Sequence, residues 1–304
     1  MELEKVIPAA SRLARHYRVT NGRTFRLEDI DPADTAWLKQ EDKPRAKEAL
    51  QAGIEALAEL QDMLYAQDRW AVLLVFQAMD AAGKDGAIKH VMSGVNPQGC
   101  QVASFKAPSA EELDHDYLWR CNRHLPERGR IGIFNRSYYE EVLVVRVHPE
   151  LLHHQKLPES RVVKSIWKDR HRDIRAYERY LHANGVVVRK FFLHVSREEQ
   201  KKRFLERIEN PEKHWKFEAG DVRERGHWDD YMHAYEDAIR STATRDCPWY
   251  VVPADNKWFT RAVVAAVVID TLASLGLHYP RVGPAKLEEL AAARKTLLGE
   301  GKTK

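Results

Sequence analysis

Cysteines and long apolar runs are both scarce in this sequence. Its 304 residues contain three cysteines, Cys100, Cys121 and Cys247, which are unevenly spaced and form no CxxC pair. Such spacing favours reduced thiols over a disulfide framework or a cysteine-based metal site. No segment approaches the roughly 20 apolar residues of a membrane span, and the first residues lack the apolar core of a signal peptide. We therefore expect a cytoplasmic protein that does not bind membranes.

A large charge of one sign is also missing. The 49 lysines and arginines and the 45 aspartates and glutamates leave a formal net charge of +4. This mild balance gives no reason to expect binding to nucleic acid, so the places where basic residues cluster matter more than their number. Hydrophobic residues make up 44% of the chain and charged residues 31%, which is typical of a globular protein with a substantial core.

The apolar pattern predicts short strands that alternate with helices. The expected strands are residues 71–76, 101–105, 130–134, 186–195 and 249–252. The expected helices are residues 43–67, 109–124, 159–183, 196–209, 228–241 and 258–275, with another opening at residue 84. This alternation predicts an α/β fold, a three-layer αβα sandwich around a five-stranded parallel sheet.

The remaining segments predict how this single domain is completed. We expect residues 1–40 to form a loosely packed, irregular arm and residues 283–304 to form a charged, amphipathic tail. Residues 197–227 are rich in basic side chains and contain Pro211, Gly220 and Gly226. This combination is typical of a mobile lid over a phosphate site.

The turn after the first predicted strand is the most informative segment. Gly83 and Lys84 open a helix whose free amide groups point into the turn, and a lysine there reaches a β- or γ-phosphate. The match to the eight-residue P-loop pattern is incomplete, because Ala78 replaces the first glycine and Asp85 replaces the metal-binding serine or threonine. A simple strand-to-helix turn that needs glycine is the alternative interpretation.

Two carboxylates in this turn suggest a metal ion. Asp80 lies inside the loop and Asp85 follows the lysine, whereas an ordinary P-loop surrounds phosphate mainly with hydrogen-bond donors. The two acids therefore predict a metal between protein and substrate, although an acidic residue in a first helical turn is also favourable by itself. Ala82, Gly83 and Gly86 are the expected phosphate contacts of the loop.

Other predicted strands end in residues suited to phosphate. Asn135 and Arg136 follow the third strand, where an amide orients a ligand oxygen and a guanidinium supplies a bidentate fork. Lys106 follows the second strand. Because the carboxyl ends of parallel strands meet at one edge of the sheet, we expect these residues to lie beside the loop. A strand-end turn with exposed basic side chains is the alternative.

The basic lid segment supplies further candidates. Arg203 and Arg207 are four residues apart and share a helix face, and Lys213 and Lys216 alternate with aromatic residues in the following loop. A solvated helix face is the ordinary interpretation of such a run. Its position after the long fourth strand favours a role in binding phosphate.

These motifs together resemble the polyphosphate kinase 2 family over residues 17–279. The segments that carry the resemblance are residues 77–86, 104–106, 116–120, 133–137 and 210–217. The resemblance implies a thymidylate kinase-like P-loop fold with a helical lid and Mg²⁺-dependent transfer of phosphate between inorganic polyphosphate and nucleotides. Asp80 and Lys84 match the Walker A acid and lysine of the family. Asn135, where an aspartate is commoner, and Glu140 are similar to the class III subgroup, whose members phosphorylate nucleoside mono- and diphosphates.

The predicted function is therefore transfer of phosphate from polyphosphate to AMP and ADP. In this hypothesis Asp80 and Asp85 hold Mg²⁺, with Mn²⁺ as an alternative, and Glu140 positions the acceptor nucleotide or a second metal. The phosphate-binding residues are Lys84, Lys106, Arg120, Arg136, Arg203 or Arg207, Lys213 and Lys216. Guanine nucleotides are an alternative acceptor, and a dimer or tetramer is expected. The competing hypotheses are an ATP-dependent nucleoside monophosphate kinase and a non-catalytic module that binds polyanions.

Overall fold

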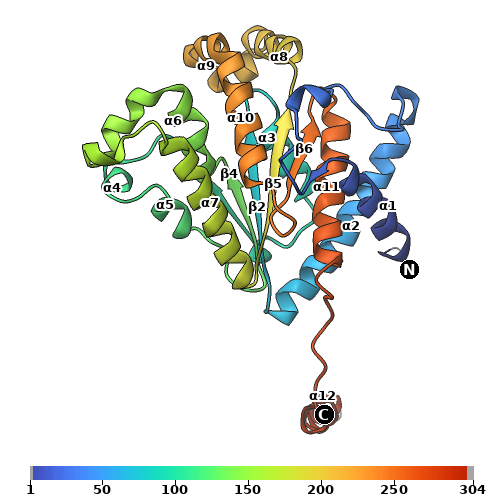
Figure 1. Ribbon diagram of the computed structural model, residues 1–304. Coiled ribbons are helices and arrows are strands. Elements are labelled where there is room, and N and C mark those ends of the chain that lie inside the picture. The colour runs from blue at the N-terminus through green and yellow to red at the C-terminus, as the bar shows by residue number, and fades with distance from the viewer. Residues whose placement is uncertain (1–2, 300–304) are drawn as a thin grey trace.

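A mixed six-stranded sheet forms the centre of the computed structural model, which describes residues 3–299 (Figure 1). Its strands lie in the order β1-β6-β5-β2-β4-β3. Their bounds are Arg18–Val19 for β1, Ala71–Ala78 for β2, Cys100–Ser104 for β3, Ile131–Asn135 for β4, Val186–His194 for β5 and Trp249–Pro253 for β6. The five predicted strands are present and parallel, but the predicted count is wrong. The two-residue β1 pairs antiparallel with β6 and is too short for a periodic signal.

Helices cover both faces of this sheet (Figure 1). The helices of the described residues are α1 (Leu3–His16), α2 (Lys43–Gln67), α3 (Lys84–Val91), α4 (Ala110–Leu113), α5 (Trp119–Asn122), α6 (Val144–Val147), α7 (Ile166–Ala183), α8 (Arg197–Glu209), α9 (Ala219–Glu224), α10 (Trp228–Thr242), α11 (Lys257–Ala273) and α12 (Pro284–Gly299). Helix α12 lies away from the sheet and covers neither face (Figure 1). Helix α11 packs on α1, α2 and α3, whereas α7 packs on α10 and β5. The three-layer αβα sandwich predicted from the sequence is thus confirmed.

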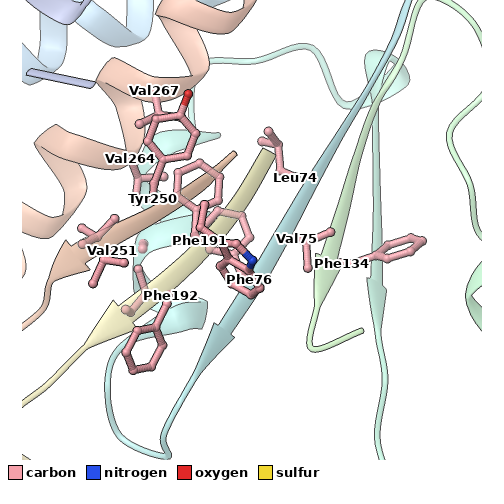
Figure 2. Packing of buried hydrophobic residues seen from close by; sticks show 14 of the residues in the cluster. Leu74, Val75, Phe76, Phe134, Phe191, Phe192, Tyr250, Val251, Val264 and Val267 are labelled. Atoms are coloured by element: carbon pink, nitrogen blue, oxygen red, sulfur yellow. The ribbon is translucent and has the colours of Figure 1, made fainter. Parts of the chain in front are cut away.

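The core is centred on β2 and β5, which are covered on both faces. Seven of the eight β2 residues are buried, as expected for a parallel strand between two helical layers. Phe76 of β2 stacks on Phe191 of β5 with ring centroids 4.6 Å apart (Figure 2). The edge strand β3 is mostly exposed. The loop that follows β2 is therefore carried by a strand that is buried almost throughout.

The predicted irregular N-terminal arm is wrong. Residues 3–16 form α1, which packs along α11 and buries Ala10 and Ala14. These small residues are four apart and allow close approach of the two helices. The two arginines of this helix, Arg12 and Arg15, are exposed, and they obscured the pattern in the sequence.

Two other segments differ from the prediction, and the predicted tail is described only in part. The helix expected over residues 109–124 is split into α4 and α5, and a capping box of Ser109 and Glu112 opens the first of them. Residues 211–216, which the proline and glycines of this stretch led us to expect as a loop, form a 3-10 helix and are followed by α9, so the lid segment is helical, as the resemblance implied. In the tail, α12 is exposed throughout, and the last five residues predicted there lie outside the described part.

All three cysteines are free, as their spacing predicted. Among the residues described, no helix combines the length and apolar character required to cross a bilayer.

Two buried histidines make folding sensitive to pH. Burial lowers the pKa of both His171 and His194 to about 4. Because these pKa values lie below the ordinary value near 6.5, the unfolded chain binds protons that the folded chain does not as pH falls from 6.5 to 4. We expect the free energy of unfolding to decrease over this range by up to about 1.4 kcal/mol per pH unit for each histidine. Denaturant titrations at pH 7 and pH 5 measure this change. His171→Gln should reduce the dependence of the free energy of unfolding on pH, whereas His153→Gln, at an exposed position, should leave it unchanged. The same pH dependence in His171→Gln and in the parent would contradict the assignment.

Candidate active site

The loop between β2 and α3 has the backbone conformation of a phosphate-binding turn. Gly83 has φ +105°, and Ala81, a residue with a side chain, has φ +61°. Positive φ at a non-glycine residue is unfavourable and is typical of functional turns. The amide of Ala82 donates to the carbonyl of Met79 at 3.3 Å, so it is engaged within the turn. Gly83 and Gly86, the other two loop residues expected to contact phosphate, lie at the N-cap and in the first turn of α3.

The predicted lysine lies inside this turn. Lys84 is the first residue of α3, and its ammonium donates to the carbonyl of Ala78 at 2.8 Å. Burial lowers the pKa of Lys84, while the negative charges of Asp80, Glu140 and Asp85 oppose that shift. The ammonium is thus partly removed from water, which strengthens its attraction for a phosphate oxygen, whereas the neighbouring carboxylates would repel phosphate unless a cation offset their charge.

Arg136 joins the end of β4 to the loop. Its guanidinium is 3.1 Å from Asp80 and 3.9 Å from Glu140. Burial acts to lower the pKa of Arg136, but these two carboxylates outweigh it and the pKa is raised. Arg136 has φ +64°, and its amide donates to the carbonyl of Phe76 at 3.0 Å. The strained backbone is therefore held against β2 and directs a permanent cation toward the loop.

Gln77 orients the predicted acidic residue Glu140. The amide of Gln77 donates to Glu140 at 2.7 Å, and its carbonyl accepts from Ser137 at 3.1 Å. Gln77 is 1% exposed. The sequence analysis did not select it, although a polar residue near the end of an apolar strand was a usable signal. Both ends of the 137–140 segment are thus fixed to β2.

Asn135 and Asp85 contact each other beside the loop. The side-chain amide of Asn135 donates to Asp85 at 2.7 Å. An amide adds no charge here but fixes the direction of the carboxylate. This pairing connects the end of β4 with the first turn of α3, two places that the sequence had put at one edge of the sheet.

The acidic residues fit a metal that is shared with substrate. Within residues 3–299, no group of three or more histidine, cysteine, aspartate or glutamate side chains forms a ready-made cage. Mg²⁺ usually binds proteins through one or two carboxylates and takes its other ligands from phosphate and water. Asp80 and Asp85 provide two carboxylates, so the donor set matches this mode of binding.

Arg203 supports the loop from behind. Its guanidinium donates to the carbonyls of Ala81, Ala82 and Ala254 at 3.0, 2.9 and 2.6 Å, and to Glu199 at 2.9 Å. The residue is 4% exposed. These partners occupy the planar donor fork, so the arrangement favours a supporting role in place of the phosphate contact that the sequence suggested.

The remaining lid residues lie above the loop. Arg207 lies 3.7 Å from Asp221 of α9, and the pKa of Asp221 is raised by burial and by the charge of Asp80. Asp221, which was not predicted from the sequence, thus pairs with a lid arginine. Lys213 and Lys216 are exposed.

A further link connects lid and loop. Gln200 of α8 donates to the carbonyl of Asp80 at 2.9 Å and accepts from Arg225 at 2.6 Å. The backbone of the loop is thus coupled to the base of the lid. Movement of α8 would therefore reach the loop through this amide as well as through Arg203.

Lys106 and Arg120 lie at the end of β3. Lys106 is exposed, and its carbonyl accepts from Arg120 at 2.8 Å. Arg120 also lies 3.3 Å from Glu112. Arg120 therefore ties α5 to the segment after β3, and part of its donor capacity is used within the protein.

Comparison with known proteins places this chain among polyphosphate kinases. Residues 38–276 match the family model of polyphosphate kinase 2. The chain is 57% identical to an ADP-polyphosphate phosphotransferase of Rhodopseudomonas palustris over 85% of this chain and 90% of that protein. It is 45% identical to an AMP/ADP-polyphosphate phosphotransferase of Meiothermus ruber over 88% of this chain and 96% of that one. The crystal structure of polyphosphate kinase 2 from Arthrobacter aurescens TC1 superposes with a TM-score of 0.83 at 38% identity, covering 92% and 96% of the two chains. The chain belongs to the polyphosphate kinase 2 family.

Proposed function

We propose that this protein transfers phosphate from inorganic polyphosphate to AMP and ADP, forming ADP and ATP, in a Mg²⁺-dependent reaction. The observation that carries the proposal is the meeting of Lys84, Asp80 and Arg136 at one strained turn, in a member of this family. Phosphoryl transfer needs alignment and charge stabilisation more than covalent chemistry, and this turn offers both.

The residues take distinct roles in this proposal. Lys84 and Arg136 contact the oxygens of the transferring phosphate and stabilise the charge that they carry in the transition state. Asp80 and Asp85 hold Mg²⁺, with Mn²⁺ as a substitute, and the bound ion neutralises phosphate oxygens. Asn135 keeps Asp85 in place, and Gln77 keeps Glu140 directed toward the acceptor nucleotide.

The polyphosphate chain extends beyond the loop along basic side chains. We assign this flank to Lys106, Arg207, Lys213 and Lys216, with weaker support from Arg120, whose contacts within the protein compete. A linear polyanion bound in this way releases counterions, so binding should weaken steeply with salt, by analogy with nucleic acid backbones. The proposal further places the protein in the cytoplasm as a homo-oligomer, with neither nucleic acid nor membrane as a partner.

The deciding experiment supplies AMP, polyphosphate and Mg²⁺ without ATP. We expect ADP to appear first and ATP later in a time course resolved by chromatography, and chelation of the metal should stop both. An ATP-dependent kinase would form no ADP until ATP is added. A module that only binds polyanions would form neither product under any condition.

Glu140 supplies a test of acceptor choice. Its carboxylate is fixed by Gln77 and lies near Arg136, so an asparagine, which is neutral and one methylene shorter, would remove the charge and withdraw the polar group from this position. We expect Glu140→Asn to lower kcat/KM for AMP by about tenfold more than kcat/KM for ADP, the size of one well-placed polar contact. Initial rates with each acceptor measure the two losses. Equal losses for AMP and ADP would remove Glu140 from acceptor selection.

A further inference from the structure

A buried ion pair lies beneath the segment that carries Arg136 and Glu140. Lys190 of β5 and Glu178 of α7 are 2.6 Å apart, and their side chains are 0% and 1% exposed. Removing two charges from water is expensive, and a buried pair often contributes no more stability than apolar side chains of similar volume. Stability alone is therefore a weak reason for charges at this position.

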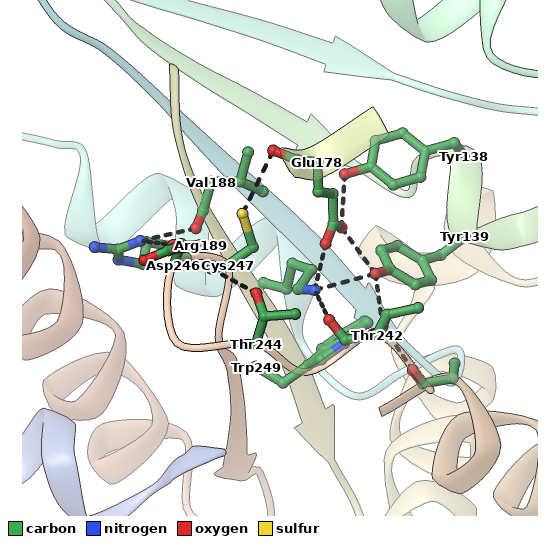
Figure 3. A network of polar contacts seen from close by, with 12 residues as sticks. Tyr138, Tyr139, Glu178, Val188, Arg189, Thr242, Thr244, Asp246, Cys247 and Trp249 are labelled. Carbon is green, nitrogen blue, oxygen red and sulfur yellow. Dashed lines mark hydrogen bonds and ion pairs between the residues drawn. The ribbon is translucent and has the colours of Figure 1, made fainter. Parts of the chain in front are cut away.

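The pair belongs to a network in which every strong donor has a partner. The ammonium of Lys190 donates to Glu178, to the hydroxyl of Tyr139 at 3.2 Å and to the carbonyl of Thr242 at 2.9 Å. Glu178 also accepts from Tyr138 at 3.0 Å and from Tyr139 at 2.8 Å (Figure 3). A fully satisfied buried network has one low-energy geometry, so it fixes the tyrosine hydroxyls in space.

Both tyrosines lie between the two proposed active-site residues of this segment. Tyr138 and Tyr139 are 1% and 0% exposed, and they follow Arg136 and precede Glu140 in the chain. The amide of Tyr139 donates to the hydroxyl of Ser137 at 3.1 Å, which keeps the turn tight. Displacement of either ring therefore moves the backbone that carries Arg136 and Glu140.

The network also touches the strand that leads into the loop. Lys190 pairs in register with Val75 of β2, one residue before Phe76. The carbonyl of Phe76 accepts from the amide of Arg136 at 3.0 Å. The ion pair is thus set directly below the junction of β2 with the strained residue.

We propose that Glu178 and Lys190 are positioning residues that act through Tyr138 and Tyr139 to hold Arg136 and Glu140 against the phosphate-binding loop. This inference rests on the proposed function, because it assigns these two residues to the transfer reaction. None of the four network residues contacts the substrate in this arrangement. Their effect is on the alignment of the transferring phosphate.

The test removes the hydroxyls and leaves the rings. In the double variant Tyr138→Phe with Tyr139→Phe, we expect kcat to fall about tenfold or more, since small misplacement of aligned groups is costly. The KM for polyphosphate should stay within about twofold, because the lid and strand-end cations that bind the chain are unchanged. Tyr250→Phe is the matched control, since Tyr250 is also 1% exposed but its hydroxyl lies beside Arg18.

Two readouts separate positioning from general stability. Melting temperatures of the double variant and of the control are compared, and we expect kcat to fall only in the double variant even where both lose similar stability. In crystal structures, the 3.1 Å contact between Arg136 and Asp80 should lengthen in the double variant and persist in Tyr250→Phe.

The inference and the proposed function fail in different ways. An active parent whose double variant keeps its kcat, or a double variant that retains the Arg136–Asp80 contact, would overturn the positioning role. A parent that forms no ADP from AMP and polyphosphate would overturn the proposed function. The crystallographic comparison still decides the positioning claim in that case, because it needs no turnover.

Discussion

Substitution of Lys84 by methionine should lower the turnover of AMP with polyphosphate about a thousandfold, the upper range for loss of one preorganised charge donor. Lys84 is the cation placed inside the loop, and burial has already removed part of its hydration, as its lowered pKa indicates. A dehydrated ammonium interacts strongly with phosphate oxygens because the local dielectric is low. Methionine has a similar length and no charge, so it removes this interaction while filling the same space.

The folded state should tolerate this change. The ammonium of Lys84 bonds to a single carbonyl, that of Ala78. We expect the melting temperature to stay within a few degrees of the parent. Lys89→Met is the matched control, because Lys89 lies exposed in the last turn of the same helix and should keep full turnover. Comparable turnover in Lys84→Met and the parent would exclude Lys84 from the reaction.

Arg136→Lys should lower kcat about a hundredfold although it keeps the positive charge, because a lysine lacks the planar fork that binds two oxygens at once. The guanidinium lies 3.1 Å from Asp80 and 3.9 Å from Glu140, so it already occupies the centre of the polar cluster. Lysine meets the same backbone strain at φ +64°, which leaves the side chain as the main difference.

Steady-state kinetics with saturating AMP measure this prediction. Arg130→Lys is the control, since Arg130 immediately precedes β4, at the opposite end of the strand from Arg136. A variant that loses affinity for polyphosphate but retains kcat would reassign Arg136 to ground-state binding. Retention of both parameters would remove Arg136 from the site.

The sequence predicted the parts of this site that depend on strand ends. Lys84, Asp80, Asn135 and Arg136 lie at or just after the ends of two mostly apolar strands, and parallel pairing brings such ends together without further information. Their contacts with one another are specific, but their common location follows from topology alone. The first-turn position of Lys84 followed from the glycine before it.

The contacts that long polar side chains make could not be predicted from the sequence. Arg203 lies on a basic helix and faces backbone carbonyls, because the loop above it leaves several of them without other partners. Gln77 and Asp221 carried no periodic signal, and their roles depend on contacts between elements far apart in the chain. The role of each of these residues depends on the direction in which its side chain points, which the residue type alone does not give.

The fold shows the same division. Buried strands were predicted from continuous apolar runs, and long helices were predicted from apolar residues at helical spacing. The two-residue β1 and the packing of α1 depend on long-range contacts with β6 and α11, which no local pattern encodes. The short helices of the lid lack enough residues for a measurable period.

The central place of β2 in the sheet has a consequence for biosynthesis. On one side β2 pairs with β4, which leaves the ribosome early, and on the other with β5, which is made much later. Until Val186–His194 emerges, an eight-residue apolar strand presents an open edge, the kind of edge that pairs with foreign strands. The nascent chain therefore depends on protection of that edge during this interval, and fragments that end before β5 are expected to aggregate.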